Sequence, residues 1–185
     1  ALIRQFHTGT KMLLILPGSH TKMVSVNAGE QITGCLTSIT GELLDSITNY
    51  TVLADSVEHR FVSADNYDRK MVIAGYKNAE KNGLGRAGFS CRILNLFYTN
   101  DNAELASYLL GACCQNDLKA IKSSDAIQVD RDTTVIVAGK TVLQQAMVDI
   151  LKEDGYFRKI LDYKNGSDIP LSAYGAYMVA EEKNL

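Results

Sequence analysis

The chain of 185 residues has no tryptophan, only two prolines and no excess of positive charge. A formal net charge of -2 leaves no basic surface for a nucleic acid or an anionic membrane. No apolar run approaches the length of a membrane span, and the first residues lack the charged-then-apolar layout of a signal peptide. We therefore expect a cytoplasmic protein that binds neither nucleic acid nor membrane.

Cysteine and histidine are also scarce. The four cysteines form no C-x-x-C pair, and the three histidines are too scattered along the sequence to indicate a metal site. These residues are Cys35, Cys91, Cys113, Cys114, His7, His20 and His59. We predict reduced structural thiols, as in a cytoplasmic protein, and no metal held by the chain itself.

The length fits one domain with a substantial hydrophobic core. Residues 1–6 have apolar side chains spaced as at the end of a helix, but the chain has no initiator Met and no residue that would cap a helix start there. Residues 7–10 are expected to form the loop into the first strand. We therefore expect the sequence to be part of a longer protein.

Three apolar runs open the domain. Residues 11–16 are almost continuously apolar, as in a strand buried on both faces, and two further runs cover 23–26 and 32–39. Pro17 and Gly18 stand at the second and third positions of the first turn, which suits a type II turn. Short turns between the runs predict an antiparallel meander of three strands.

The middle of the chain changes to helical spacing of its apolar residues. Helices are expected at 43–53, 66–81, 89–96 and 103–121. Asp101 or Asn102 would cap the last of them. The stretch at about 55–122 is therefore predicted to be a helical insertion.

The remaining sequence alternates between strand and helix patterns. A strand over 133–138 leads into a helix that ends at Gly155, as a left-handed C-cap would. A strand over 157–163 leads through a turn at 165–168 into a closing helix over 170–182. The predicted fold is thus α/β: a mixed five-stranded sheet of three antiparallel strands followed by parallel crossovers, with helices on both faces.

The turn between the first two strands carries the first candidate site. Gly18 and Ser19 would present backbone N–H groups beside the hydroxyls of Ser19 and Thr21, the imidazole of His20 and the ammonium of Lys22. Fixed N–H dipoles and a cation can replace the water around a phosphate. We therefore predict that these five residues bind phosphate; the alternative is a polar hairpin tip without a ligand.

A glycine motif at 83–88, GLGRAG, matches G-x-G-x-x-G. The dinucleotide-binding mechanism requires a strand immediately before this motif. Here the preceding segment is polar and helix-like, so we predict a helix C-cap followed by a loop.

A second glycine stretch, AGKT at 138–141, ends like a Walker A motif, but Thr134 stands where the first glycine of that motif is required. A strand-to-helix junction that opens on Gly139, followed by Lys140 and Thr141, can still let a nucleotide approach the backbone. A plain turn is the equally open alternative.

Two charged residues complete the candidates. Glu42 follows Thr40 and Gly41 at the start of a predicted helix, where it either caps the helix or binds a metal-held water. Glu42 is the candidate catalytic residue within this chain. Arg92, on a mostly apolar helix, is predicted to pair with an acid of the helical block, with a phosphate as the alternative partner.

Several of these stretches together resemble the 2-keto-3-deoxygalactonate kinase family. LPGSHTKMV at 16–24 and TGEL at 40–43 are similar to that family's L-P-G-[ST]-H-[ST]-K-W and T-G-E-L. FSCR at 89–92 and SYLLG at 107–111 are similar to its F-S-x-R and S-Y-L-S-G, and VAG at 137–139 is similar to its later strand and turn. The similarity runs in order through most of the chain.

The resemblance implies a sugar-acid kinase of the actin/hexokinase/Hsp70 ATPase superfamily. Its members have two ribonuclease-H-like domains, each ordered βββαβαβα, with ATP held between them. The implied fold is a ribonuclease H-like (actin-like ATPase) domain, in which residues 18–22 form the second phosphate loop and Gly139, Lys140 and Thr141 belong to the nucleotide-binding turn. The implied cofactors are ATP and Mg2+, and the implied acceptor is 2-dehydro-3-deoxy-D-galactonate, a 2-keto-3-deoxy sugar acid of galactonate catabolism.

The resemblance also implies that residues 1–185 are the C-terminal half of a two-domain kinase. The N-terminal domain, with the first phosphate loop and a magnesium-associated acid, would lie upstream of Ala1 together with the catalytic base. This half alone is then expected to bind nucleotide weakly and to be inactive. Expected partners are the nucleotide, the sugar acid, the missing domain and, as a further candidate, a second copy of the chain.

Three residues depart from the family pattern. Met23, Leu110 and Lys140 replace a Trp, a Ser and a small residue, and the first two changes bear on substrate identity. A non-catalytic nucleotide-binding or structural domain of the same superfamily is the alternative function.

Overall fold

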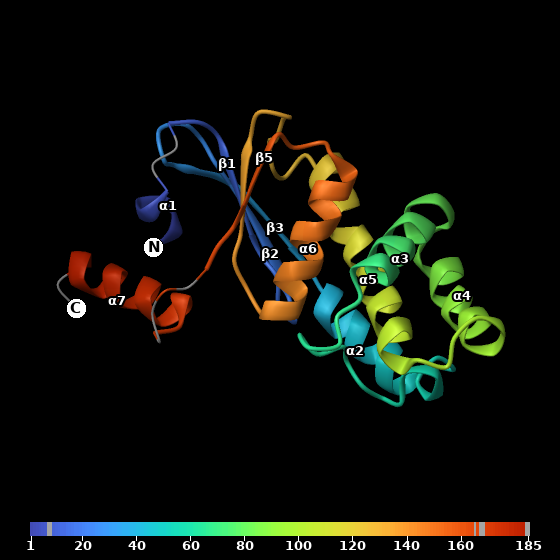
Figure 1. Cartoon of the computed structure of the whole chain (residues 1–185). Helices are drawn as coiled ribbons and strands as arrows, with labels where there is room; N and C mark the ends of the chain where they lie inside the picture. The colour runs from blue at the N-terminus through green and yellow to red at the C-terminus, as the bar shows by residue number, and fades with distance from the viewer. Residues whose placement is uncertain (7–8, 165, 167–168, 184–185) are drawn as a thin grey trace.

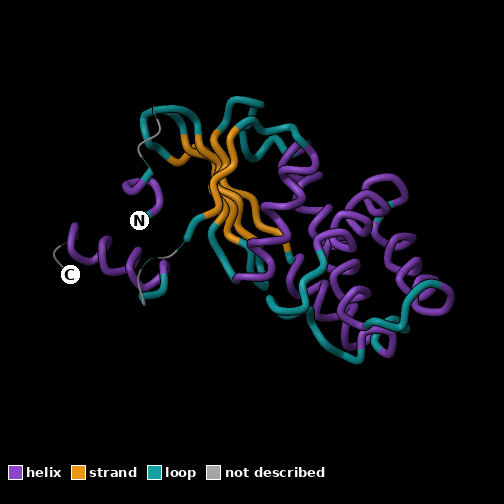
Figure 2. The backbone as a smooth tube through the Cα atoms, viewed as in Figure 1, coloured by secondary structure: helices purple, strands orange, loops and turns teal. Residues whose placement is uncertain are grey.

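A mixed sheet lies at the centre of the domain (Figures 1 and 2). The structure, a computed structural model, describes residues 1–6, 9–164, 166 and 169–183. Within these residues five strands form one sheet in the order β3-β2-β1-β4-β5. The strands are β1 (Met12–Leu16), β2 (Thr21–Val26), β3 (Ile32–Ser38), β4 (Thr134–Val137) and β5 (Lys159–Asp162).

The strand directions agree with the predicted sheet. β1 pairs antiparallel with β2, and β2 pairs antiparallel with β3. β1 then pairs in parallel with β4, with Leu13 opposite Val135, and β4 pairs in parallel with β5. The mixed five-stranded α/β architecture predicted from the sequence is therefore confirmed.

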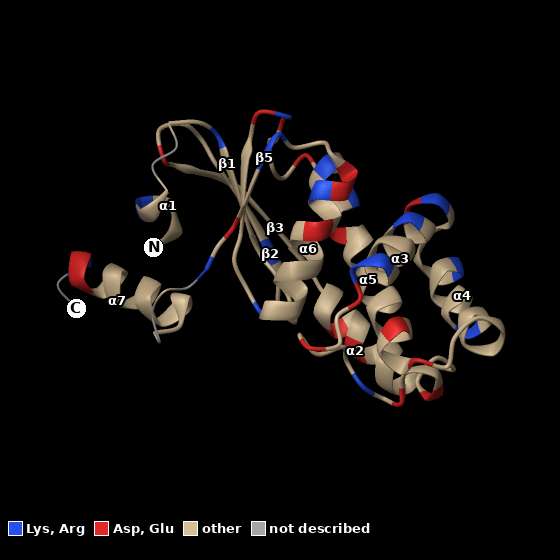
Figure 3. Cartoon of the chain, viewed as in Figure 1, with Lys and Arg blue, Asp and Glu red and all other residues tan. Residues whose placement is uncertain are grey.

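Helices cover both faces of the sheet, most of them on one side (Figure 1). They are α1 (Leu2–Gln5), α2 (Thr40–Tyr50), the 3-10 turn η1 (Asp55–Val57), α3 (Arg69–Asn82), α4 (Leu84–Phe97), α5 (Asn102–Ser123), α6 (Thr141–Asp154) and α7 (Leu171–Lys183). None of the helices in the described part of the chain is long and apolar enough to cross a membrane. Charged residues of both signs are spread over the helices and loops, with few in the strands (Figure 3).

The core has two layers because successive strand residues point to opposite faces. Leu13 and Ile15 belong to the large cluster that includes residues of α5 and α6. Met12 and Leu14 belong to a smaller cluster with Leu2 of α1. Each strand of the sheet centre is therefore buried on both faces, which explains the almost continuous apolar run in β1.

Helices α3 and α5 pack at backbone distance in the helical block. A Cβ added at Gly75 of α3 would lie 1.9 Å from the carbonyl oxygen of Tyr108, and one added at Gly111 of α5 would lie 1.9 Å from that of Val72. The glycine of the SYLLG stretch thus allows the close contact of two helices. The same contact lets the Tyr108 hydroxyl accept a hydrogen bond from Asn78 at 2.5 Å.

The helix ends confirm three predictions and correct one. Asp101 accepts hydrogen bonds from the N–H groups of Ala103 and Glu104, and Gly155 ends α6 with a φ of 69°. Gly83 is the C-cap of α3, as predicted, with a φ of 78°, but the loop predicted after it is wrong because α4 begins at the next residue. A positive φ turns the chain sharply enough for Leu84 to pack at once between the two helices.

The predicted type II turn at the first hairpin is also wrong. Such a turn requires a positive φ at Gly18, and the described glycines with positive φ are Gly9, Gly83 and Gly155. Neighbouring backbone segments contact the connection between β1 and β2 from two sides. The predicted turn at 165–168 and the loop at 7–10 lie partly outside the described residues.

The four cysteines are free thiols, as predicted. Three of them, Cys91, Cys113 and Cys114, are buried, and Cys35 is exposed on β3. Burial raises the pKa of the Cys91 and Cys113 thiols to about 12, so both remain protonated at neutral pH. They act as small apolar core residues.

We predict that Gly111→Ala lowers the free energy of unfolding by about 1–3 kcal/mol, because its methyl group would meet the α3 backbone rather than a flexible side chain. Gly85→Ala is the matched control, since an added Cβ at this position of α4 has no neighbour within 4 Å. The control should be neutral or slightly stabilising, because alanine favours a helix. Urea denaturation measures both variants, and equal losses would contradict the packing explanation.

Candidate functional site

The connection between β1 and β2, here named the tip loop (residues 17–20), lies against the start of α2 and the junction between β4 and α6. The N–H of Glu42 donates to the Ser19 carbonyl at 3.1 Å. The N–H of Lys140 donates to the Pro17 carbonyl at 3.3 Å. Three segments far apart in the sequence therefore meet through their backbones.

Two glycines make this meeting possible. A Cβ added at Gly41 would lie 2.2 Å from the Gly18 carbonyl oxygen, and one added at Gly139 would lie 2.4 Å from the Pro17 carbonyl oxygen. We predicted that Gly139 lets a ligand approach the backbone. In the structure the close neighbour of Gly139 is the tip loop itself.

The tip loop leaves its N–H groups available. Its two backbone contacts use the carbonyls of Pro17 and Ser19, and the N–H groups of Gly18, Ser19 and His20 make no hydrogen bond with the described residues. Ser19 and His20 are exposed. Consecutive N–H groups of this kind bind anions, because their dipoles are already fixed.

The side chains around the tip loop point in different directions. His20 Nε2 lies 3.2 Å from Glu42 Oε1, and both side chains are about half exposed. Thr21 is buried, whereas Lys22 is exposed and forms no ion pair among the described residues. Because they are neighbours in β2, Thr21 and Lys22 point to opposite faces of the sheet. The Thr21 hydroxyl therefore lies in the core. Phosphate binding would require it to lie at the surface of the tip loop.

A buried carboxylate on α5, that of Asp117, lies at the end of β3 and the start of α2. Asp117 Oδ1 accepts hydrogen bonds from Ser38 Oγ and from Thr40 Oγ1, both at 2.5 Å. Burial raises the pKa of Asp117 above its ordinary value, and the hydroxyls of Ser38, Thr40 and Thr21 oppose that rise. Through Ser38 and Thr40, Asp117 links α5 to the end of β3 and the start of α2.

Gln144 fixes the junction between β4 and α6. Its Oε1 accepts a hydrogen bond from the Gly139 N–H at 2.7 Å, and its Nε2 donates to Asp162 Oδ1 and to the Tyr163 carbonyl, both at 2.6 Å. The Gln144 side chain is buried, so these bonds are shielded from water. The backbone of residues 139–140 is thus held in one position against the end of β5.

A cavity of about 470 Å3 opens beside the tip loop. Its apolar lining comes from Leu44, Phe61, Val62, Ala106, Leu110, Val142 and Leu143, and its polar lining from Ser19, Glu42, Asp45, Thr48, Arg60 and Lys140. Apolar walls with a few convergent polar groups are typical of small-molecule sites. A larger groove of about 1330 Å3 lies along Gly139, Lys140 and α7, so Lys140 lines both spaces.

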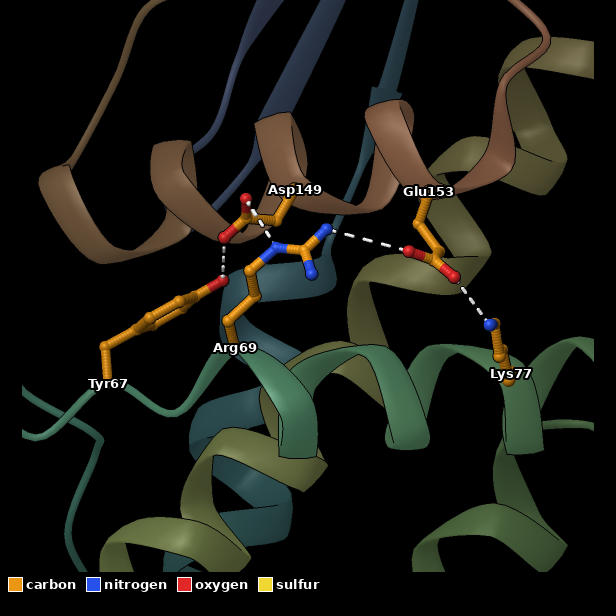
Figure 4. Close-up of polar contacts among 5 residues, drawn as sticks. All are labelled: Tyr67, Arg69, Lys77, Asp149 and Glu153. Atoms are coloured by element: carbon orange, nitrogen blue, oxygen red, sulfur yellow. Dashed lines mark hydrogen bonds and ion pairs between the residues drawn. The ribbon is translucent and has the colours of Figure 1, made fainter.

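A polar cluster ties α6 to α3 (Figure 4). Tyr67 Oη donates to Asp149 at 2.9 Å and Arg69 Nε donates to the same carboxylate at 3.2 Å. Glu153 pairs with Arg69 at 3.6 Å and with Lys77 at 2.5 Å. Burial, followed by the hydrogen bond to Asp149, raises the pKa of Tyr67 well above its ordinary value, so its hydroxyl remains a donor. The cluster joins the helical block to the helix that begins at the candidate site.

The structure separates the remaining candidates. Thr141 begins α6 and is exposed at its N-terminus. Arg92 donates to Ser56 Oγ at 3.4 Å and has no ion pair among the described residues, so the predicted acid partner is wrong. α4 itself carries no acidic residue, and the group that Arg92 contacts is the hydroxyl of Ser56 on η1. Within the described residues no cluster of three or more His, Cys, Asp or Glu side chains could hold a metal.

The sequence analysis missed three components of the site: Asp117, Gln144 and the segment 60–62. Asp117 follows Leu109 and Cys113 at intervals of four on the buried face of α5, a position that predicts burial. Gln144 likewise lies among inward-facing positions of α6. In both cases a polar residue on an otherwise apolar helix face was the feature of the sequence that could have indicated a buried polar contact. Segment 60–62 carries no comparable signal.

The fold is that of a kinase-like α/β domain, with the tip loop and a cavity beside it at the end of the central strand β1. The model of the 2-keto-3-deoxy-galactonokinase family matches residues 2–169, and the chain belongs to that family. The resemblance found in the sequence motifs is therefore confirmed.

A solved structure gives the same result. The chain is similar to a protein from Sinorhizobium meliloti provisionally named 2-dehydro-3-deoxygalactonokinase, with a TM-score of 0.60 and 26% sequence identity. The similarity covers 83% of this chain and 50% of that protein, so the chain spans half the length of this relative. A comparison with curated proteins gave no match.

We predict that Asp117→Asn removes a pH-dependent cost to stability. Because the folded-state pKa of Asp117 is raised, this group costs nothing below the ordinary carboxyl pKa of about 4 and destabilises the fold increasingly as pH rises through the folded pKa. The free energy of unfolding of the variant minus that of the wild type should therefore increase with pH above about 4. Urea denaturation from acid to neutral pH measures this difference, in which the other carboxylates cancel. A difference independent of pH would contradict the raised pKa.

Proposed function

We propose that this chain is the nucleotide- and phosphate-binding half of a kinase that transfers the γ-phosphoryl group of ATP to a hydroxyl of 2-dehydro-3-deoxy-D-galactonate. One observation carries the proposal: the N–H groups of Gly18, Ser19 and His20 make no hydrogen bond with the described residues, and Ser19 in the middle of this run lines a cavity of about 470 Å3. The family supports the choice of acceptor. Phosphoryl transfer depends mainly on positioning and on electrostatic stabilisation, which these residues are suited to provide.

In this proposal the tip loop binds the terminal phosphates. The N–H groups of residues 18–20 donate to phosphate oxygens, and the ammonium groups of Lys22 and Lys140 approach from opposite sides of the loop. The loop is fixed through Gly41 and Gly139 before the nucleotide arrives, so little reorganisation is needed as charge develops. Thr21 is not among the phosphate ligands, because its hydroxyl is buried.

The cavity receives the nucleoside. Its apolar residues, such as Leu44, Val62 and Leu143, would contact the faces of the base, and the carboxylate of Asp45 would accept hydrogen bonds from ribose hydroxyls. Lys140 lines the cavity and its N–H donates to the Pro17 carbonyl of the tip loop, so it would contact the nucleotide between the nucleoside and the phosphates. Its neighbours Gly139 and Thr141 line the adjoining larger groove and not this cavity, so Lys140 is the residue of the three that the proposal places against the nucleoside.

Mg2+ fits this half of the site through the nucleotide and not through a protein cage. Mg2+ is usually held by one or two carboxylates together with substrate phosphates and water. Glu42, at the start of α2 beside Ser19, is the carboxylate placed for this on the chain, and its contact with His20 orients it. When bound, the metal neutralises charge that develops on the transferred phosphoryl group.

The proposed whole protein has a second domain that supplies the catalytic base and most sugar contacts. The chain spans half of its relative from Sinorhizobium meliloti, and its order of three antiparallel strands, helix, strand, helix, strand, helix fits one ribonuclease H-like domain with helices α3–α5 inserted. The half alone would bind nucleotide weakly and catalyse no transfer, because half of the cleft is absent.

Calorimetric titration with ATP and Mg2+ tests this proposal. We expect millimolar or tighter binding by the wild type and about five- to tenfold weaker binding by Lys22→Ala and Lys140→Ala, the loss expected for one charged phosphate contact. Lys70→Ala is the matched control, because Lys70 is an exposed lysine on α3. It should leave the affinity unchanged.

Absence of binding at millimolar nucleotide, or equal losses in all three variants, would contradict the phosphate site. The acceptor is tested separately on the full-length protein, by ADP release with 2-dehydro-3-deoxy-D-galactonate. Nucleotide binding without ADP release would favour the non-catalytic alternative.

A further inference from the structure

Asp117 is the most enclosed charged side chain near the tip loop. It is 1% exposed and lies on α5, against the end of β3 at Ser38, which pairs with Thr21 at the start of β2. Two hydroxyls donate to its Oδ1, whereas Oδ2 is buried without a hydrogen-bond partner among the described residues. No described cation pairs with it. An unpaired buried carboxylate is costly, so its presence needs an explanation.

Stability does not supply that explanation. A well-packed apolar or amide side chain avoids the cost of burying charge and is often neutral or stabilising at such a position. The hydroxyls of Ser38 and Thr40 lie 3.1 Å apart and could bond to each other without the carboxylate. What the carboxylate adds is a single acceptor that holds both hydroxyls, and so fixes the segments that carry them.

Those segments are the two sides of the tip loop. Thr21 is the first residue after the loop and pairs with Ser38 across β2 and β3. Thr40 begins α2 and precedes Gly41, where an added Cβ would lie 2.6 Å from the Ser19 Cα. The next N–H along α2 donates to the Ser19 carbonyl. A shift of Thr21 or of Thr40 would therefore move the loop N–H groups directly.

We propose that Asp117 is a positioning residue, which sets the geometry of the phosphate-binding tip loop by holding the hydroxyls of Ser38 and Thr40 on one carboxylate oxygen and, through Ser38, its strand partner Thr21. This inference rests on the proposed function of the loop. It does not involve the nucleoside cavity, which Asp117 does not line. Loss of the carboxylate should therefore weaken phosphate recognition selectively.

NMR titration of the chain with ATP and with adenosine tests this selectivity. In Asp117→Ala we expect the affinity for ATP to fall about tenfold, the equivalent of one phosphate hydrogen bond, while the affinity for adenosine is unchanged. The backbone amide signals of residues 18–20 should shift. Asp117→Asn keeps an oxygen that can accept both hydroxyls, and should restore the ATP affinity to within about twofold of wild type.

Asp154→Ala is the matched control for stability. This carboxylate is also buried, accepts a hydrogen bond from Tyr76 at 2.9 Å and pairs with Lys122, but lies at the end of α6 away from the tip loop. Whatever either substitution does to the melting temperature, Asp154→Ala should leave the ratio of ATP to adenosine affinity at the wild-type value. A merely structural role for Asp117 would make the two variants alike.

Two results would overturn the inference: equal losses of ATP and adenosine affinity in Asp117→Ala, or unchanged amide signals at 18–20 in a folded variant. Failure of the proposed function looks different, because the wild type itself would then not bind ATP. If the wild type does not bind ATP, the positioning role of Asp117 is judged from the amide signals of residues 18–20 alone. Shifts in Asp117→Ala that are absent in Asp154→Ala would support the positioning role, and their absence would overturn it.

Discussion

The close approach of three backbone segments at the tip loop is the constraint on which the candidate site depends. α2 and α6 both direct an N–H group at a loop carbonyl, and each can come this near because a glycine stands at the contact, Gly41 or Gly139. With its carbonyls engaged, the loop keeps its N–H groups for a ligand. The helices also bring Glu42 and Lys140 to the edge of the cavity. The proposed phosphate and nucleoside sites are thus adjacent for a geometric reason.

Polar contacts on the sides of α2 and α6 that face away from the tip loop hold these two helices in place. Gln144 holds the start of α6 against β5, and the Asp149 and Glu153 carboxylates hold its middle against α3. Asp117 holds the start of α2 against α5. Surface ion pairs of this kind contribute little individually, but the enclosed hydrogen bonds of Gln144 and Asp117 are protected from water. The site is therefore fixed mainly from its buried side.

The sequence predicted the elements well, because the information for them is local. A continuous apolar run in β1, helical spacing in α5 and a glycine C-cap at Gly155 are each decided within a few residues. The turn at Gly18 was mispredicted because its conformation depends on α2 and α6, which lie distant in sequence. The loop predicted after Gly83 was an error of a different kind, since a positive φ can end one helix and allow the next to begin at once.

The site could be predicted only in part, for a related reason. Residue types suited to phosphate binding were visible in the tip loop, but the strand alternation that buries Thr21 and exposes Lys22 was not used to distinguish them. Asp117 and Gln144 could be recognised as unusual on apolar helix faces, but not assigned partners. A hydrogen bond between residues more than seventy positions apart, such as that between Thr40 and Asp117, leaves no pattern in one sequence.

The two glycine contacts also constrain how this family can vary in evolution. Backbone touches backbone on both sides of the tip loop, so neither an insertion in the loop nor a larger residue at position 41 or 139 can be absorbed by rotating a side chain. The corner at Gly83 differs: its φ of 78° still favours glycine, but nothing lies within 4 Å of an added Cβ, so no neighbouring segment limits the length of the chain there. Length changes among homologues should therefore accumulate at the α3–α4 corner, while the loop between β1 and β2 keeps a constant length.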